Sequence, residues 1–323
     1  MLRLYATAFA PIIGGLLLAV VAWLIARRSG ASQGGATGGR LAPVLAGGIP
    51  LVLVITLRLW QYSPVLFAAR LPRAVFEWLP SVQFILPLIL GALGLVLLGL
   101  SRTGPRRRGV AIVARRTPWE FLPRGLTVTF AVLVAFAVAL ALAAGVASDP
   151  DPQGRYQQYT VDVGTAGMTL GNFYGWYYSI PAMIVLAVLL VFVLAHAVLV
   201  ARPALAAGYQ QKADVASRRR LLRNALLLVS GAVLLHLWSV LKNLADVAAS
   251  SGMVSPTERS VFLFGPPFAA LEPALSVAAL CAYGLGVAAW AGVVLSAIPP
   301  RRLGKAPRSA EDRRPAATDT DPT

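Results

Sequence analysis

The chain has 323 residues, of which 57% are hydrophobic and only 13% are charged, and its mean hydropathy is +0.70. Soluble domains carry about a quarter charged residues, so this composition excludes an ordinary soluble protein and indicates a chain surrounded largely by lipid. The net charge of +16 does not indicate a nucleic-acid partner, because the basic residues form short clusters between long apolar runs. Such clusters orient membrane proteins and contact anionic lipid headgroups.

Seven apolar stretches approach or exceed the roughly 20 residues that a helix needs to cross the hydrocarbon core of a bilayer. They are Phe9–Ile25, Pro43–Leu59, Val82–Leu100, Leu126–Val146, Ser179–Val200, Leu221–Leu241 and Phe268–Ile298. The sequence therefore predicts an all-α fold, a single transmembrane helix bundle that occupies residues 1–298. The remaining residues, 299–323, are rich in proline, charge and threonine, which is typical of a disordered tail.

The positions of the basic residues predict the orientation of this bundle. With the N-terminus outside, the segments 27–42, 101–124, 202–223 and 299–323 are cytoplasmic and hold 22 of the 29 lysines and arginines. The excess of lysine and arginine in cytoplasmic segments favours an outer N-terminus and a cytoplasmic C-terminus. We therefore expect a multi-pass protein of a bacterial cytoplasmic membrane, with anionic lipid headgroups bound at the cytoplasmic arginine clusters.

Two segments outside the predicted spans have sequences that predict secondary structure of their own. Residues 61–81 are interrupted by proline and arginine, which predicts a short amphipathic helix on the outer surface. Residues 148–178 form the longest outer loop, in which Arg155–Gly164 has strand-like composition and predicts a hairpin or extended segment over the bundle. The loop begins with Asp149–Gly154, which resembles the start of a calcium loop but has Thr160 where the bidentate glutamate belongs. We expect a solvent-exposed turn there.

The sixth predicted span carries polar side chains along one face. Five of them fall within an arc of roughly 120° at the helical period: His236, Ser239, Lys242, Asn243 and Asp246. Polar groups in a membrane helix usually face the bundle interior, a partner or a water-filled cavity, so this face could line a polar cavity open to the outside. In the alternative interpretation, His236 bonds to a neighbouring helix while Lys242 and Asp246 extend to the outer interface.

Glu272 lies near the outer end of the seventh predicted span, at a depth similar to that of Lys242. An ion pair between these two side chains would lower the cost of burying either charge, whereas an unpaired Glu272 would be favoured by the dipole at the start of its helix. The two histidines, His196 and His236, are staggered by about 16 Å along the bundle, so we do not expect them to share a metal or a haem.

Rows of small residues at four-residue spacing also occur, and we expect them to let neighbouring helices approach closely. These rows are Ala131–Ala135–Ala139–Ala143 and Ala274–Ala278–Ala282–Gly286. Cys281 is the only cysteine, so the sequence predicts neither an intramolecular disulfide nor a thiolate metal site. We expect no cofactor and no metal.

Motifs for hydrolysis or nucleotide binding are absent: there is no G-x-S-x-G, no H-E-x-x-H and no Walker A loop. In composition and topology the whole chain resembles uncharacterised multi-pass membrane proteins of high-GC Gram-positive bacteria. Our first hypothesis is therefore a non-enzymatic accessory or partner component of a transport or envelope system, bound to another membrane protein. The alternatives are a small-solute permease that uses the polar face of the sixth span, and an intramembrane enzyme with His236 as a base beside Asp246.

Overall fold

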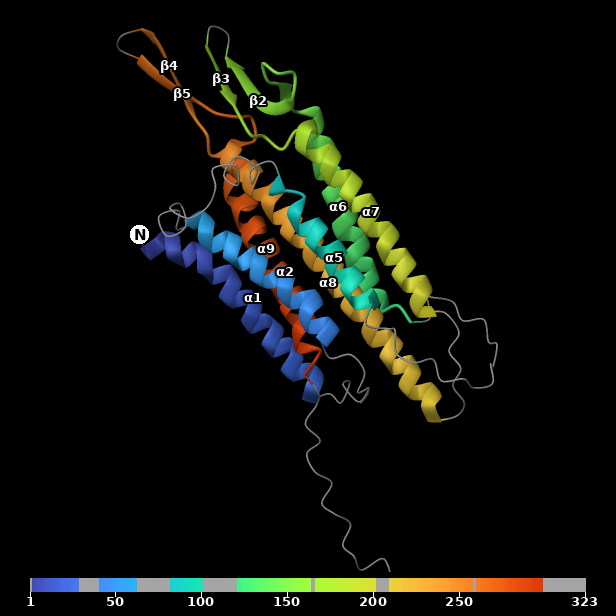
Figure 1. Ribbon diagram of the computed structural model, residues 1–323. Coiled ribbons are helices and arrows are strands. Elements are labelled where there is room, and N and C mark those ends of the chain that lie inside the picture. The colour runs from blue at the N-terminus through green and yellow to red at the C-terminus, as the bar shows by residue number, and fades with distance from the viewer. Residues whose placement is uncertain are drawn as a thin grey trace, which may run out of the picture.

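The computed structural model describes residues 2–28, 41–62, 82–100, 121–163, 166–201, 209–257 and 260–298. The amphipathic helix predicted at 61–81 falls almost entirely outside these residues, as do the predicted tail at 299–323 and most of each predicted cytoplasmic segment. Within the described residues the chain is mostly helical, and the helices run side by side as a bundle (Figure 1).

A helix occupies each of the seven predicted apolar stretches. The helices are α1 (Leu2–Arg28), α2 (Leu41–Tyr62), α5 (Leu86–Leu100), α6 (Arg124–Val146), α7 (Trp176–Ala201), α8 (Tyr209–Ala248) and α9 (Glu272–Leu295). Six of them are long and apolar enough to cross a membrane, whereas α5 has only 15 residues. The chain is thus a multi-pass membrane protein by the length and composition of its helices, and the predicted seventh span depends on α5.

Helix α8 is the centre of the bundle. It packs against α5, α6, α7 and α9. In its most apolar stretch 83% of the residues are buried inside the bundle, compared with 17% for the corresponding stretches of α1 and α6. Its 40 residues correspond to a length of roughly 60 Å, about twice the hydrocarbon thickness of a bilayer. His236, a member of the predicted polar face of this helix, is therefore placed at the centre of the molecule.

Close helix contacts depend on glycines of α8 and α9. A Cβ atom on Gly231 would lie 2.5 Å from the Trp290 ring, and one on Gly286 would lie 2.7 Å from Leu235. Trp290 is fully buried and donates its indole N–H to the carbonyl of Leu228 at 2.8 Å. Any larger residue at either glycine would force α8 and α9 apart.

The rows of small residues differ in burial on the two helices that carry them. On α9, Ala282 and Gly286 are buried, whereas Ala274 and Ala278 are exposed. On α6, all four alanines of the predicted row are exposed, and the buried side chains lie on another face that includes Phe130 and Ala137. The prediction of close packing is therefore wrong for the α6 row within this chain.

Two antiparallel sheets lie together at one end of the bundle, which we call the hairpin end (Figure 1). The first contains β1 (Asp149–Pro150), β2 (Tyr156–Val163) and β3 (Ala166–Leu170), and the second contains β4 (Gly252–Thr257) and β5 (Ser260–Phe264). We call these five strands the hairpin cap. In the first sheet Tyr159 lies opposite Leu170, and in the second Met253 lies opposite Leu263.

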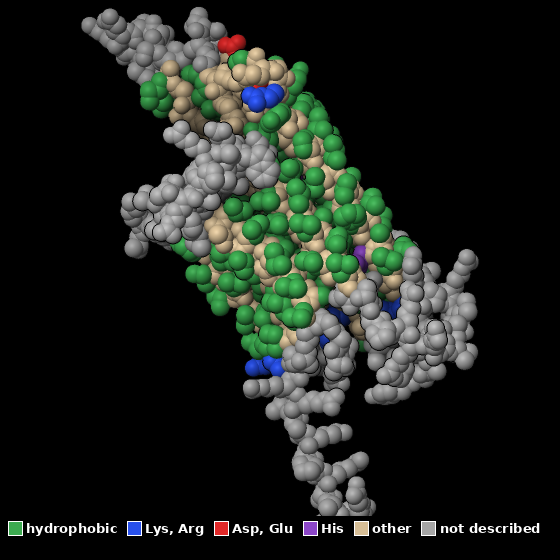
Figure 2. Space-filling view, viewed as in Figure 1, with side chains coloured by type: hydrophobic (Ala, Val, Ile, Leu, Met, Phe, Trp, Pro, Cys, Tyr) green, Lys and Arg blue, Asp and Glu red, His purple; other side chains and the backbone are tan. Residues whose placement is uncertain are grey.

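The hairpin predicted at Arg155–Gly164 is confirmed, because β2 pairs with β3 and the Tyr159 ring packs 5.4 Å from that of Phe268. The second hairpin, β4–β5, was not expected from the sequence. The fold is thus mostly helical, consistent with the predicted all-α membrane helix bundle, and it carries a small β cap in addition. Figure 2 shows hydrophobic side chains covering the visible flank of the bundle, with Lys and Arg side chains near its ends.

Candidate functional site

His236 lies in the core of the bundle and is 2% exposed. Its Nδ1 lies 2.7 Å from the carbonyl oxygen of Phe84, just before α5, and its Nε2 lies 3.4 Å from the hydroxyl of Tyr174, just before α7. A carbonyl oxygen can only accept a hydrogen bond, so we assign the proton to Nδ1 and the acceptor role to Nε2. The imidazole therefore joins α8 to the segments that precede α5 and α7.

Aromatic rings surround this contact. The Phe84 ring centroid lies 4.8 Å from that of Tyr174 and 5.1 Å from that of Tyr178, and the Tyr174 ring lies 6.0 Å from the His236 ring. All four side chains are less than 9% exposed. Because burial raises the pKa of the Tyr174 phenol above its ordinary value, this hydroxyl stays protonated and can donate to His236.

Asn243 lies about two turns along α8 from His236 and holds the loop between β3 and α7. Its Oδ1 accepts the backbone N–H of Tyr174 at 2.9 Å, and its Nδ2 donates to the carbonyl of Asn172 at 2.8 Å. Asn172 has a φ of 57°, a left-handed conformation that asparagine tolerates better than most residues. One amide side chain thus satisfies two backbone groups of an irregular loop.

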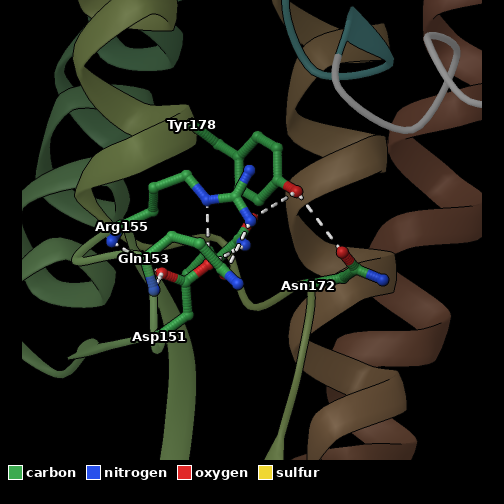
Figure 3. Close-up of polar contacts among 6 residues, drawn as sticks. Asp151, Gln153, Arg155, Asn172 and Tyr178 are labelled. Atoms are coloured by element: carbon green, nitrogen blue, oxygen red, sulfur yellow. Dashed lines mark hydrogen bonds and ion pairs between the residues drawn. The ribbon is translucent and has the colours of Figure 1, made fainter.

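The hydrogen bonds continue from this loop into the first sheet (Figure 3). The hydroxyl of Tyr178 lies 3.1 Å from Gln157 Oε1 and 3.4 Å from Asn172 Oδ1, and it can donate to one of them at a time. Gln157 in turn donates to Asp151 Oδ2 at 2.6 Å. The whole set, which we call the cap network, contains His236, Tyr174, Asn243, Asn172, Tyr178, Gln157, Asp151 and Arg155.

Asp151 is the most highly bonded carboxylate among the described residues, and it is only 7% exposed. It accepts the backbone N–H groups of Gln153 and Arg155 at 2.9 and 2.8 Å, and the Arg155 guanidinium at 2.8 Å. Burial acts to raise the pKa of Asp151, but the hydrogen bonds from Arg155, Gln157 and Gln153 outweigh it and hold that pKa below its ordinary value of 3.8. The solvent-exposed turn predicted here is therefore wrong for Asp151, whose oxygens bind protein donors.

The charged members of the predicted polar face lie outside the core. Lys242 forms an ion pair with Asp246 on the same helix, and their side chains are 42% and 61% exposed. Of the two interpretations of Glu272, the ion pair with Lys242 is not formed: Lys242 pairs with Asp246, and Glu272 accepts a hydrogen bond from Ser276 at 2.8 Å. Asp246 therefore does not line a polar cavity as in the first interpretation of this face, and its exposure agrees with the alternative interpretation.

The remaining polar residues of α8 and α7 have separate roles. Ser239 bonds back to the carbonyl of Leu235 in its own helix, at 3.3 Å. His196 is buried beside Gly99, near the end of α5, whereas His236 contacts Phe84 just before the start of that helix. Fifteen residues separate these two contacts, or roughly 22 Å at the helical rise, so the two histidines are staggered along the bundle as predicted.

A second polar site was not expected from the sequence. Arg58 of α2, next to the outer end of its predicted span, is only 6% exposed. Its guanidinium carbon lies 4.6 Å from the ring centroid of Trp238 on α8 and 5.4 Å from that of Tyr283 on α9, and the two rings are 4.7 Å apart. We call these three residues the Arg58 cluster. The signal in the sequence was an arginine inside an apolar helix, which usually faces the bundle interior.

Comparison of the chain with protein-family models, with curated proteins and with solved structures found no match. The chemistry of the two sites is therefore read from their geometry. The neutral polar groups of the cap network bond to one another and to backbone, which makes this site a structural connection between the bundle core and the hairpin cap. The Arg58 cluster instead places a permanently charged group between three helices.

Proposed function

We propose that the protein is a non-enzymatic accessory or partner component of a transport or envelope system. The observation that carries this proposal is the cap network. A permease of the kind considered above would use His236 and Asn243 to contact solute, but here these side chains bond to Phe84, Tyr174 and Asn172. The polar residues at the centre of the bundle thus support a fixed cap.

The cap offers a surface suited to a protein partner. Met253 and Leu263 lie directly opposite each other on β4 and β5, and they are 76% and 68% exposed. Opposite residues of an antiparallel pair project from the same face of a sheet, so the two side chains form one apolar spot. An apolar spot on a protruding hairpin is typical of a contact site for another protein.

The contact can be tested by photo-crosslinking in the native host. A photoreactive amino acid at position 263, or separately at 253, is expected to give one discrete heavier adduct when the protein is made at its natural level. The matched control is Val132 of α6, an apolar residue that is 61% exposed but lies on the helix bundle. Absence of any discrete adduct from both hairpin positions would contradict the partner role.

The orientation belongs to the same proposal: seven spans in a bacterial cytoplasmic membrane, with the hairpin end outside and the C-terminus in the cytoplasm. Its support is the excess of basic residues in the segments at the opposite end of the bundle. A reporter active only in the cytoplasm is expected to work when fused after Arg108 or Arg220 and to fail after Asp162. Activity at Asp162 would overturn the orientation.

The opposite end is also proposed to contact anionic lipid headgroups through its arginines. On α8, Arg218 donates to the carbonyl of Val200 near the end of α7 and lies over the Phe121 ring, whereas its neighbour Arg219 is exposed. The first arginine therefore satisfies a helix terminus, and the second is available to lipid. Replacing Arg219 with glutamine is expected to weaken binding to vesicles that contain phosphatidylglycerol, without changing the unfolding midpoint.

A further inference from the structure

The two strands of the β4–β5 hairpin differ in how well their outer edges are protected against pairing. β4 lies beside β3 of the first sheet, it contains Pro256, and its pairing with β5 is irregular between Val254 and Thr257. Proline has no N–H to donate, and irregular pairing is one of the features that protect the edge strands of natural proteins. The β4 edge is therefore poorly suited to pair with a further strand.

β5 forms the opposite edge of the hairpin and has none of these features. Its five residues, Ser260–Phe264, include no proline and no charge, and valine and phenylalanine are favoured in strands. Within the residues that the structure describes, β5 pairs with β4 alone, so its outer edge has no strand partner there. An uncharged edge strand of this kind is a template for pairing with another chain.

A third strand at this edge would also stabilise the hairpin. An isolated two-stranded hairpin is marginally stable in water, whereas three strands with an apolar face can be stable. Leu263 of β5 is 68% exposed, as is 76% of Met253 opposite it on β4. A strand added beside β5 would lie about 4.8 Å away, which brings its side chains into contact with Leu263. The apolar spot of the hairpin thus continues to the edge of β5.

We propose that the edge of β5 binds an extended segment of the partner protein, which adds to the hairpin as a third strand. This proposal rests on the partner role and the orientation proposed above, so the segment belongs to the outer part of an envelope protein. Backbone hydrogen bonds along β5 supply the affinity, and contacts with alternate side chains supply the specificity. The segment is uncharged and apolar, because a charge placed beside Leu263 would lose water without gaining a partner.

Photo-crosslinking at adjacent positions distinguishes strand addition from a contact made by the apolar spot alone. Neighbouring positions of a strand project from opposite faces of the sheet, but all of them border the same edge. The photoreactive residue p-benzoylphenylalanine, placed singly at 262, 263 and 264 in native membranes, is therefore expected to link to one short segment of one protein. The linked residue, mapped by mass spectrometry, is expected to shift along that segment by about one residue for each step along β5. Position 132 on α6 is the control and is expected to give no link to that segment.

The outcomes separate this proposal from the partner role on which it rests. Adducts from 253 and 263 alone, or adducts that all reach a single partner residue, would overturn strand addition and leave the partner role intact. An adduct that joins two copies of this chain through β5 would also overturn it, because no partner protein would then occupy the edge. Absence of any discrete adduct from 253, 262, 263 and 264 would contradict the partner role and strand addition together. Positions 262 and 264 are phenylalanines, so an aromatic photoreactive residue is a conservative replacement there.

Discussion

The polar face of α8 consists of two parts that the structure separates. His236 and Asn243 bond to segments far away in the sequence, whereas Lys242 and Asp246 bond to each other on the helix surface. All four residues fall on one arc of the helix, and Lys242 and Asn243 are adjacent. The difference shows that helical periodicity identifies a shared face, while the packing of neighbouring segments decides which members of that face are buried.

The energetic consequence is that the two parts contribute unequally to stability. A buried polar group that loses its partner costs its full desolvation penalty, whereas an exposed ion pair contributes little. Substitutions along α8 can therefore test this difference, and the larger effects are expected for His236 and Asn243.

The largest effect is expected for His236→Ala. This change removes the group that joins Phe84 and Tyr174 and leaves a cavity in a region of aromatic packing. We expect the free energy of unfolding to fall by about 2–4 kcal/mol, measured in detergent by denaturant titration. The control is Ser239→Ala, which loses only a bond to its own helix and is expected to cost less than about 1 kcal/mol. Equal losses of stability in the two variants would mean that the contacts of His236 contribute no more to stability than the bond of Ser239 within its own helix.

Asn243→Ala is expected to cost somewhat less, about 2 kcal/mol, because two hydrogen bonds to the loop are lost but the site lies nearer the surface. The more specific consequence is local. Backbone hydrogen exchange at Tyr174 is expected to accelerate, since Asn243 accepts that N–H in the folded protein. Unchanged exchange at Tyr174 would mean that the loop holds its conformation without Asn243.

A pH effect is expected where the cap network reaches Asp151. The pKa of this carboxyl is lowered in the folded protein, so its contribution to stability is complete above the ordinary value of 3.8. The contribution is lost as the pH falls below 3.8 through the lowered pKa. The protection of backbone amides in residues 151–157, relative to the intrinsic exchange rate at each pH, is therefore expected to stay constant down to about pH 4 and to decrease in more acidic solution. Asp151→Asn should remove most of this pH dependence.

The smallest effect is expected for the exposed part of the face. Asp246→Asn breaks the ion pair with Lys242 and is expected to cost less than about 0.5 kcal/mol, with a further decrease in high salt. Glu272→Gln is expected to cost less than about 1 kcal/mol, because its carboxylate accepts from Ser276 and does not balance a buried lysine. A cost of several kcal/mol for either change would restore the buried ion pair expected from the sequence.

Much of the helical architecture could be predicted because each apolar stretch carries its own signal of length and hydropathy. The β2–β3 hairpin was also predictable from the strand-like composition around Tyr159. The β4–β5 hairpin was not, because its strands follow α8 closely and contain Pro256, which argues against a strand. The side-chain partners could not be predicted either. The acceptor for His236 is a backbone carbonyl, that of Phe84, which no residue pattern marks.

Arg58 is a second residue whose side-chain partners could not be predicted from the sequence. It stands one residue before the predicted end of its span, Leu59, so the sequence placed it at the interface. Its burial results from the positions of Trp238 and Tyr283 on two other helices, and these positions depend on how α2 packs against the bundle. A charged residue near a helix end can extend to the surface or turn inward, and only the tertiary contacts distinguish these outcomes.

The central claim is that the part of the α8 face formed by His236 and Asn243 is a closed structural connection and not the lining of a solute path. Single cysteines at Val240, one turn from His236 and 1% exposed, and at Lys242, in a background lacking Cys281, test it directly. In folded protein, a membrane-impermeant thiol reagent applied from the hairpin end is expected to label position 242 and to leave position 240 unmodified. Rapid labelling of position 240, with the unfolding midpoint unchanged, would reveal a water-filled path towards His236 and would contradict the claim in favour of a permease.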